Sequence, residues 1–467
     1  MSDKSIKNSA LIVTVVSNFV TPLMGSSVNI ALPSLGADFA MDAVMLSWVA
    51  TSYSLAAAVG LLPAGRLADI YGRKRIYVTG MLVFTLASIL AGFSPSAGLL
   101  ITCRVLQGLG GAMIFSTGNA IITSVFGPGE RGQALGISVC AVYVGLSVGP
   151  FLGGVLTQYL SWRSIFFLMA PLGGGALFLA WTKLKLEWAE AKGQRFDLAG
   201  SLLYALALVC LMQGVSGLPE VRGLSLLGLG LAGLGVFVWW EQRVKSPIFA
   251  IGLLRTNRVF AFSSLAALIH YSATFAITFL MSLYLQNIKG LSPQNAGLLM
   301  MAQPVVMALL SPLAGRISDT IQPRVVASCG MALTCVGLAL FSFLDQNTSL
   351  GYIVVSLCLV GSGYGLFSSP NVNAIMSSVE TRFLGIAAGA VATMRILGQM
   401  VSLGIATCLF ALFIGRVQIT PQHYPALVKS LHAAFVIFAG LCLLGIFASL
   451  ARGKLNAAPA GEKSSRG

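Results

Sequence analysis

Charge is the feature that this sequence has least of. Only 9% of its 467 residues are charged, whereas a soluble domain usually carries roughly a quarter, and just 14 residues are acidic. Hydrophobic residues make up 56% of the chain. This composition excludes an ordinary soluble enzyme or binding module and predicts a protein whose solvent is the lipid bilayer.

The shortage of acidic residues leaves a formal net charge of +15, which in a soluble protein would suggest a nucleic-acid partner. Here the basic residues stand in short clusters between long apolar runs, which is the pattern that sets membrane orientation. We therefore expect lipid as a partner and no nucleic acid.

Other kinds of chemistry are missing as well. The eight cysteines lie scattered in apolar stretches without metal-ligand or disulfide spacing, so we interpret them as packing residues. The Gly-rich strings lie within apolar spans and lack the strand-to-helix context of a phosphate-binding loop or a nucleophile elbow. We expect neither an enzyme nor an ATP-driven pump, and no cofactor or metal.

What the sequence does contain is a series of apolar runs of about 20 residues, the length that spans a bilayer. The first run is too long for the apolar part of a signal peptide, so we expect it to be a retained helix. The count predicts an all-α, polytopic membrane protein with about 14 helices. The runs lie near 10 to 33, 46 to 68, 76 to 95, 98 to 125, 133 to 157, 163 to 182, 197 to 217, 223 to 241, 259 to 286, 294 to 318, 325 to 344, 350 to 377, 384 to 414 and 431 to 451.

Lysine and arginine gather in alternate connections between these runs. Roughly 22 of the 29 basic residues fall on one side and about five on the other. Because the positively charged side of a membrane protein faces the cytoplasm, we expect both termini to be cytoplasmic, in a bacterial-type inner or plasma membrane.

An internal repeat relates the two ends of the chain. The sequence from Gly65 to Asp69 closes the second run, and the similar sequence from Gly315 to Asp319 closes the second run of the last group. Two parallel six-helix repeats are an architecture of transporters that alternate access around a central site. We predict a six-helix bundle over 1–182, a linker with two additional helices over 183–255, and a second bundle with a short tail over 256–467.

Four motifs carry chemistry, and the first is Gly65-Arg66-Leu67-Ala68-Asp69-Ile70-Tyr71-Gly72-Arg73-Lys74-Arg75. Asp69 can pair with Arg73 or cap a neighbouring helix. With the three motifs below, it resembles the major facilitator superfamily, and within it the fourteen-helix drug:proton antiporters, along nearly the whole chain. The resemblance implies a latch for the outward-facing state at Gly65, Asp69, Gly72 and Arg73, with Asp319 as the counterpart in the second half. The alternative is a basic loop that only sets topology.

The second motif comprises Gly145, Gly149, Pro150 and Gly153 in the fifth helix. Glycines at this spacing let helices approach closely, and proline permits a kink, so the helix can bend and seal a pathway. The motif is similar to one associated with exporters, which implies the direction of transport. The alternative is a packing seam of small residues.

The third motif places arginines at depth. Arg104, with Gln107, Gly108 and Gly111, resembles an intramembrane arginine motif of the family, and Arg395 also fits the family pattern. An arginine inside a span should face a cavity or a partner, or else snorkel to the surface. We predict a coupling or gating role, and we hypothesise that an anionic or zwitterionic substrate, or chloride, satisfies part of the charge.

The fourth motif, from Met24 to Pro33, resembles the first-helix motif of these antiporters, but Met24 stands where they usually have an acidic residue. No span has a carboxylate at its centre. Since a buried carboxylate can shuttle protons, other proton carriers have to be considered: His270 beside Tyr271 in the ninth span, and Asp38 just beyond the first helix. His270 is equally explained as a hydrogen-bonded packing residue.

Asparagines offer further polar contacts to a central cavity. We name Asn29, Asn119, Asn371 and Asn373, each of which could instead bond between helices. The function that these motifs favour is proton-coupled export of a multidrug or toxic-solute type, by a monomer acting on a small-molecule substrate. The alternatives are a metabolite or organic-anion transporter without conventional proton coupling, and a transporter-like membrane sensor.

Overall fold

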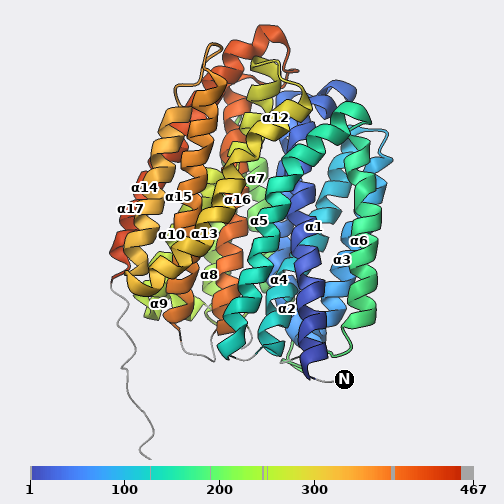
Figure 1. Ribbon diagram of the computed structural model, residues 1–467, viewed down its shortest axis with the longest axis vertical. Helices are drawn as coiled ribbons and strands as arrows, with labels where there is room; N and C mark the ends of the chain where they lie inside the picture. The colour runs from blue at the N-terminus through green and yellow to red at the C-terminus, as the bar shows by residue number, and fades with distance from the viewer. Residues whose placement is uncertain are drawn as a thin grey trace, which may run out of the picture.

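A computed structural model describes residues 3–126, 128–189, 191–244, 247–249, 251–379 and 384–453. Within these ranges every regular element is helical. Fourteen helical stretches are long and apolar enough to cross a membrane. The predicted fold class, an all-α polytopic protein with two six-helix bundles and two extra helices, is confirmed (Figure 1).

The first bundle contains six helices. Helix α1 packs along α5, α2 and α3 both pack on α4, and α3 also contacts α6. Their bounds are α1 Asp3–Asp38, α2 Ala43–Tyr71, α3 Arg73–Gly92, α4 Ala97–Val125, α5 Pro128–Tyr159 and α6 Arg163–Lys183.

The second bundle follows a short helix, α9, that the sequence did not lead us to expect. Helix α14 packs against α15 and α17, α13 against α15, and α10 against α16 and α17. The bounds are α9 Ile251–Thr256, α10 Arg258–Thr274, α11 Ile277–Leu283, the π-helical turn η1 Tyr284–Ile288, α12 Pro293–Met300, α13 Ala302–Thr320, α14 Pro323–Phe341, α15 Leu350–Ser377, α16 Leu384–Phe413, the 3₁₀ turn η3 Pro421–His423 and α17 Tyr424–Ala451.

Two spans that we predicted as continuous are interrupted. Between α10 and α11, the amide of Ala276 donates to Ser402 Oγ at 2.9 Å, so a hydroxyl from α16 satisfies a backbone group at the break. Between α12 and α13, Pro304 has no N–H to donate to the carbonyl of Met300, and the helix is interrupted at Met301. Both breaks lie in the helices that open the second bundle.

The two extra helices, α7 (Leu198–Ser216) and α8 (Val221–Glu241), form a hairpin whose first member packs on both bundles. Helix α7 contacts α2 and α16, which also contact each other. Tyr204 Oη donates to the carbonyl of Ala58 at 3.2 Å, and Leu208 and Met212 join a cluster that includes Met400. Helix α7 therefore covers one junction between the bundles.

The two ends of the molecule differ in charge. The end that holds the start of α1 carries Lys7, Arg73, Lys183 and Arg243, and it lies at the bottom of Figure 1. We call it the basic end and the opposite end the distal end.

Candidate functional site

The distal ends of the two bundles touch each other. The phenol of Tyr159 donates to Gln294 Oε1 at 3.1 Å, and Gln286 Nε2 donates to the carbonyl of Ile30 at 2.8 Å. On the flank formed by α2 and α16, the amide of Ala43 donates to the carbonyl of Val417 at 2.9 Å. These contacts close the distal end of the interface between the bundles.

The glycines of α5 lie at close approaches to two other helices. A Cβ added to Gly145 would lie 2.5 Å from the carbonyl oxygen of Phe19, and one added to Gly153 would lie 2.7 Å from Ser27 Cα. Ser27 Oγ also donates to the carbonyl of Gly149 at 2.9 Å. These positions let α5 pack directly on the backbone of α1.

The same helix face continues into the distal closure. The carbonyl oxygen of Pro150 lies against Gly297 of α12, and Gly154 lies against Pro293 at the start of that helix. Pro150, which we predicted to act in gating, thus stands where the first bundle meets the second, one helical turn from Gly154.

The predicted latch loop is held by contacts within the first bundle. Arg73 Nη2 lies 3.0 Å from Asp69 Oδ1, and Arg73 Nη1 donates to Ser124 Oγ of α4. Gly72 has φ of +117°, a conformation that favours glycine. Gly65 lies beside Ser116 of α4. The side chain of Asp319, the counterpart predicted in the second half, lies outside the described residues.

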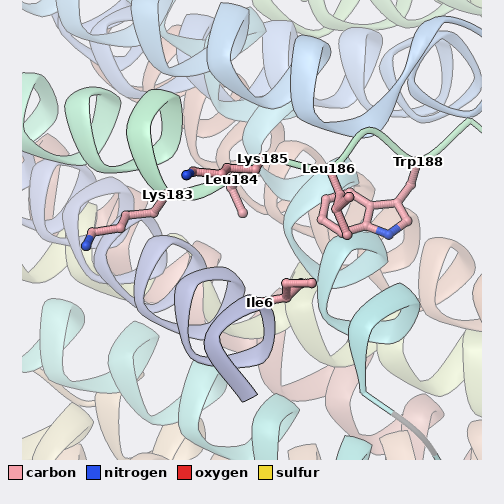
Figure 2. A pocket seen from close by; sticks show the side chains of 6 residues that line it. All are labelled: Ile6, Lys183, Leu184, Lys185, Leu186 and Trp188. Carbon is pink, nitrogen blue, oxygen red and sulfur yellow. The ribbon is translucent and has the colours of Figure 1, made fainter. Parts of the chain in front are cut away.

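A cavity of about 520 Å³ lies beside this loop at the basic end. Figure 2 shows Trp188 and Leu186 on one side, the side chains of Lys183 and Lys185 on the other, and Ile6 facing them. The carbonyl of Trp188 accepts from the amide of Arg73 at 2.9 Å, so the cavity wall and the loop form one unit. The cavity is lined by the start of α1 and by the end of α6 with the segment that follows it, and the lining includes no residue of the second bundle.

Arg104 is satisfied by neutral groups. Its side chain is 2% exposed, Nε donates to the carbonyl of Val49 at 2.9 Å, and Nη1 donates to Gln107 Oε1 at 2.9 Å. Gln107 in turn donates to Ser88 Oγ, and the guanidinium lies over the ring of Tyr53. This arginine is therefore tied to α2 and α3.

Arg395 has a different setting. It is half-buried in α16, and its guanidinium lies over the ring of Phe115 in α4, in the opposite bundle. At the same junction, Tyr143 Oη donates to Ser368 Oγ at 3.2 Å. These two contacts join the bundles within the membrane-spanning region. They bring the half-buried guanidinium of Arg395 together with aromatic rings and with the hydroxyl groups of Tyr143 and Ser368.

His270 lies in an aromatic cage next to that junction. Its ring is stacked on Phe367 with centroids 4.1 Å apart, and the centroids of Tyr364 and Tyr271 lie at 5.1 and 6.1 Å. The side chain is fully buried, and within the part of the chain that the structure describes neither ring nitrogen has a hydrogen-bond partner. A buried imidazole without a partner is unusual for a packing residue.

The other predicted cavity residues are dispersed. Met24 is 1% exposed in the core of the first bundle and Asn29 is 9% exposed in the same helix, while Asn119 is half-buried in α4. Asp38 is in an ion pair with Arg163 at 2.8 Å, at the distal end of the first bundle.

Asn371 and Asn373 contact groups within the second bundle. Asn373 Nδ2 donates to Ser318 Oγ at 3.2 Å. Asn371 Nδ2 donates to the carbonyl of Ser263, and Asn371 Oδ1 accepts from Arg452 Nη1 at 3.0 Å. Arg452, just beyond α17, is 1% exposed, and burial lowers the pKa of its guanidinium to about 10, with the nearby charge of Arg324 contributing.

Two buried carboxyl groups were not expected. Asp197, the residue before α7, accepts from the amide of Gly200 and from Trp240 Nε1, and Glu241 Oε2 accepts from the amide of Phe249 at 2.9 Å. The two side chains are 9% and 4% exposed and both lie beside Gly200. A helix-capping pattern at Asp197 was readable in the sequence; nothing there indicated that Glu241 would be covered.

Known proteins resemble this chain over most of its length. The family model described as Major Facilitator Superfamily matches residues 14–402 and 263–467. The riboflavin transporter RibZ of Clostridioides difficile is 30% identical over 93% of this chain and 95% of its own length. The multidrug resistance protein Stp of Mycobacterium tuberculosis is 33% identical over 85% and 74%. The cephamycin export protein CmcT of Amycolatopsis lactamdurans is 33% identical over 86% and 85%.

Solved structures show the same fold at low identity. A bacterial homologue of the lysosomal transporter Spinster superimposes with a TM-score of 0.65 at 15% identity, covering 96% of this chain and 97% of that one. The peptide transporter POT in complex with sulfate gives 0.67 at 14% identity, covering 95% and 98%.

Proposed function

The chain belongs to the major facilitator superfamily, and on that basis we propose that it is a proton-coupled exporter of small toxic solutes. The observation that carries this proposal is the similarity to Stp and CmcT, whose names describe resistance and export, over at least 85% of the chain. The motif in α5 that is similar to the exporter motif supports the same direction of transport.

Alternating access is the proposed mechanism. With the basic end in the cytoplasm, the distal contacts of Tyr159 and Gln286 close the external side. Rocking one bundle against the other would release these contacts and expose the junction to the outside. The loop around Asp69 and Arg73 would hold the opposite closure when the cytoplasmic side shuts.

The junction between the bundles is the proposed solute site. Tyr143 and Phe115 come from the first bundle, and Tyr364 and Arg395 come from the second. Aromatic surfaces accept apolar and flat solutes without fixing one orientation, while Arg395 adds a single charge for anionic or zwitterionic groups. This combination suits a range of solutes better than one rigid ligand.

His270 is the residue that we propose to carry the proton. No span places a carboxylate at its centre, and Asp38 is in an ion pair with Arg163 at the distal end. The imidazole stands next to the solute junction, in contact with Tyr364 and Tyr271 through its ring. Protons are the only coupling ion in this proposal, and the chain acts as a monomer without a cofactor.

A second candidate function is transport of an organic anion or a metabolite without conventional proton coupling. Arg395 favours it, because its guanidinium lies over an aromatic ring and forms no ion pair with the described residues, which leaves it able to pair with an anionic solute. The similarity to RibZ, whose name describes riboflavin transport, favours it as well.

One experiment separates these functions. Purified protein in liposomes is supplied with cationic, neutral and anionic fluorescent solutes, with and without an imposed pH gradient. Acceleration of solute flux by the gradient is the expected result. Equal flux with and without the gradient would refute proton coupling and favour the metabolite transporter, and binding without any flux would favour a membrane sensor.

A further inference from the structure

A second cavity, of about 1030 Å³, lies between the first bundle and the α7–α8 hairpin. Its walls come from α2, α4, α7 and α8, and Arg416, from the segment after α16, completes its rim. The lining does not include Arg395, so the cavity is separate from the junction that contains this residue. Most of the lining is apolar and includes Trp48, Leu55, Val105 and Leu226. An apolar cavity is filled by apolar matter rather than by water, and among membrane-spanning helices the acyl chains of lipids supply such matter.

The distal rim of this cavity is charged. Two carboxylates, Asp42 and Glu220, and two guanidinium groups, Arg222 and Arg416, belong to the lining. Asp42 Oδ1 accepts from the amide of Met45, which leaves its other oxygen available. In the part of the chain that the structure describes, neither guanidinium group donates a hydrogen bond or takes part in an ion pair, and Arg222 is bonded only through its carbonyl, which accepts from Ser225 Oγ. The rim therefore offers two positive and two negative groups to one ligand.

Between the charged rim and the apolar interior stand neutral polar groups. Gln213 and Ser216 occupy the last turn of α7 and line the cavity. Ser216 is 6% exposed, and its hydroxyl has no hydrogen-bond partner among the described residues. Ser52 of α2, also in the lining, has a buried hydroxyl with the same property. The cavity thus grades from charged to neutral polar to apolar.

The depth of the cavity corresponds to one leaflet. Along α2 the lining runs from Asp42 at the rim to Val59, and along α4 it runs from Ile101 to Leu109. The 17 residues along α2 rise about 26 Å, and the eight along α4 rise about 12 Å. One leaflet with its headgroup region is about 20 to 22 Å thick, of which about 15 Å is hydrocarbon.

We propose that this cavity binds one phospholipid of the distal leaflet, with a zwitterionic headgroup that carries a primary amine. The phosphodiester lies between Arg222 and Arg416, and the ammonium lies between Asp42 and Glu220. An ester oxygen accepts from the exposed amide of Gln213, and an acyl chain fills the apolar space beyond Val105. A headgroup with only negative charge would repel the carboxylates of Asp42 and Glu220 and would leave them without a positive partner.

The occupied cavity gives the hairpin a second means of attachment. Helix α7 contacts α2 and α16 directly, whereas α8 packs on α7 alone among the membrane-spanning helices with substantial contacts. A lipid held between α8 and the first bundle would bridge this gap. The proposal does not depend on which solute is exported, nor on proton coupling.

The test measures lipid retention by native mass spectrometry of protein delipidated in mild detergent and titrated with single phospholipids. Phosphatidylethanolamine should be retained as one molecule per chain, and about tenfold more tightly than phosphatidylglycerol or phosphatidylcholine, because only its headgroup meets all four charges with hydrogen bonds. Equal retention of all three lipids would overturn the proposal and indicate a non-specific lipid shell.

Two kinds of variant locate the bound lipid. The double variant Arg222→Gln/Arg416→Gln should weaken retention about tenfold. The double variant Lys289→Gln/Lys429→Gln removes the same charge from the distal end outside the cavity and should leave retention unchanged. Val105→Trp fills the apolar space without touching the rim and should also release the lipid, which keeps the test decisive if the arginine variant fails to fold.

Retention that survives both Val105→Trp and the arginine substitutions would place the lipid elsewhere and overturn the proposal. Displacement of the lipid by an exported solute, at the concentration that half-saturates export, would identify the cavity as a solute site instead. Lipid loss in the cavity variants with unchanged solute binding would support the proposal and separate it from the proposed transport function.

Discussion

The guanidinium carbon of Arg395 lies 5.2 Å from the ring centroid of Phe115, across the junction between the two bundles. An aromatic face attracts a cation but stabilises it less than a carboxylate at the same depth does. The guanidinium of Arg395 is therefore able to leave the ring of Phe115 and pair with an incoming anionic group.

Replacing Arg395 with glutamine should impair transport rather than folding. We expect liposome flux of anionic or zwitterionic solutes to fall about tenfold, because a contact worth roughly 1.4 kcal/mol would be lost. Arg395→Lys should recover part of this flux, since the positive charge is kept. Flux of a neutral solute should change less, and equal losses for neutral and anionic solutes would argue against a charge-recognition role.

Arg104→Gln serves as the comparison, because this arginine donates to Val49 and Gln107 inside the first bundle. Losing these bonds leaves buried acceptors unpaired, at a cost of about 1 to 3 kcal/mol. Here we expect a lower thermal midpoint in detergent, with solute selectivity unchanged in the protein that remains folded.

His270→Phe tests the proposed proton carrier. Phenylalanine fits the aromatic cage and removes two ring nitrogens that lack partners, so the thermal midpoint should hold or rise. Acceleration of export by a pH gradient should disappear. The control is His423→Gln at the distal surface, where the imidazole bonds to Thr420. A gradient effect of normal size in His270→Phe would rule His270 out as the carrier.

Gly153→Ala tests the close packing of α5 on α1. An added Cβ would lie 2.7 Å from backbone and 2.9 Å from side-chain atoms of Ser27, so we expect a loss of about 2 kcal/mol in stability. Gly136→Ala in the same helix meets nothing within 4 Å and should be neutral or slightly stabilising. Thermal unfolding followed by near-UV circular dichroism measures both, and equal midpoints would contradict the packing argument.

Arg452→Ala tests the buried network at the basic end of the second bundle. The change removes donors to Asn371, Ser263 and Ser449, all buried, and should lower stability by about 3 kcal/mol. Arg258, whose Nε donates to the carbonyl of Ala451, is exposed, and Arg258→Ala should cost less than about 1 kcal/mol. If Arg258→Ala lost more stability than Arg452→Ala, Arg258 rather than Arg452 would be the residue that stabilises this end of the bundle.

The fold was predictable because hydrophobic length alone defines a span, and all fourteen spans were found. The interruptions near Ala276 and Met301 were not foreseen, since the first depends on a hydroxyl supplied by Ser402, more than a hundred residues away. Pro304 was a local signal for the second, but proline is tolerated inside other helices of this chain, such as Pro150 in α5. The proposed domain limits remain predictions.

The candidate site was less accessible from the sequence. The pattern indicated that Arg104 and Arg395 lie at depth, but their different surroundings depend on which helices face them. Asn371 was proposed for the cavity on residue type alone, whereas its amide is used by Ser263 and Arg452. The burial of Glu241 was not foreseen, because it depends on the segment around Phe249, and the sequence pattern does not show where that segment folds.

The hydrogen bond from Tyr204 to Ala58 fixes α7 over one of the two flanks where the bundles meet. A solute that diffuses within the membrane would approach the central junction from the side, and on this flank α7 would block its path. The opposite flank, where α5 faces α12 and α13, has no such cover among the described helices. The two flanks of an otherwise pseudo-symmetric transporter therefore differ in how easily a solute can reach the junction from the bilayer.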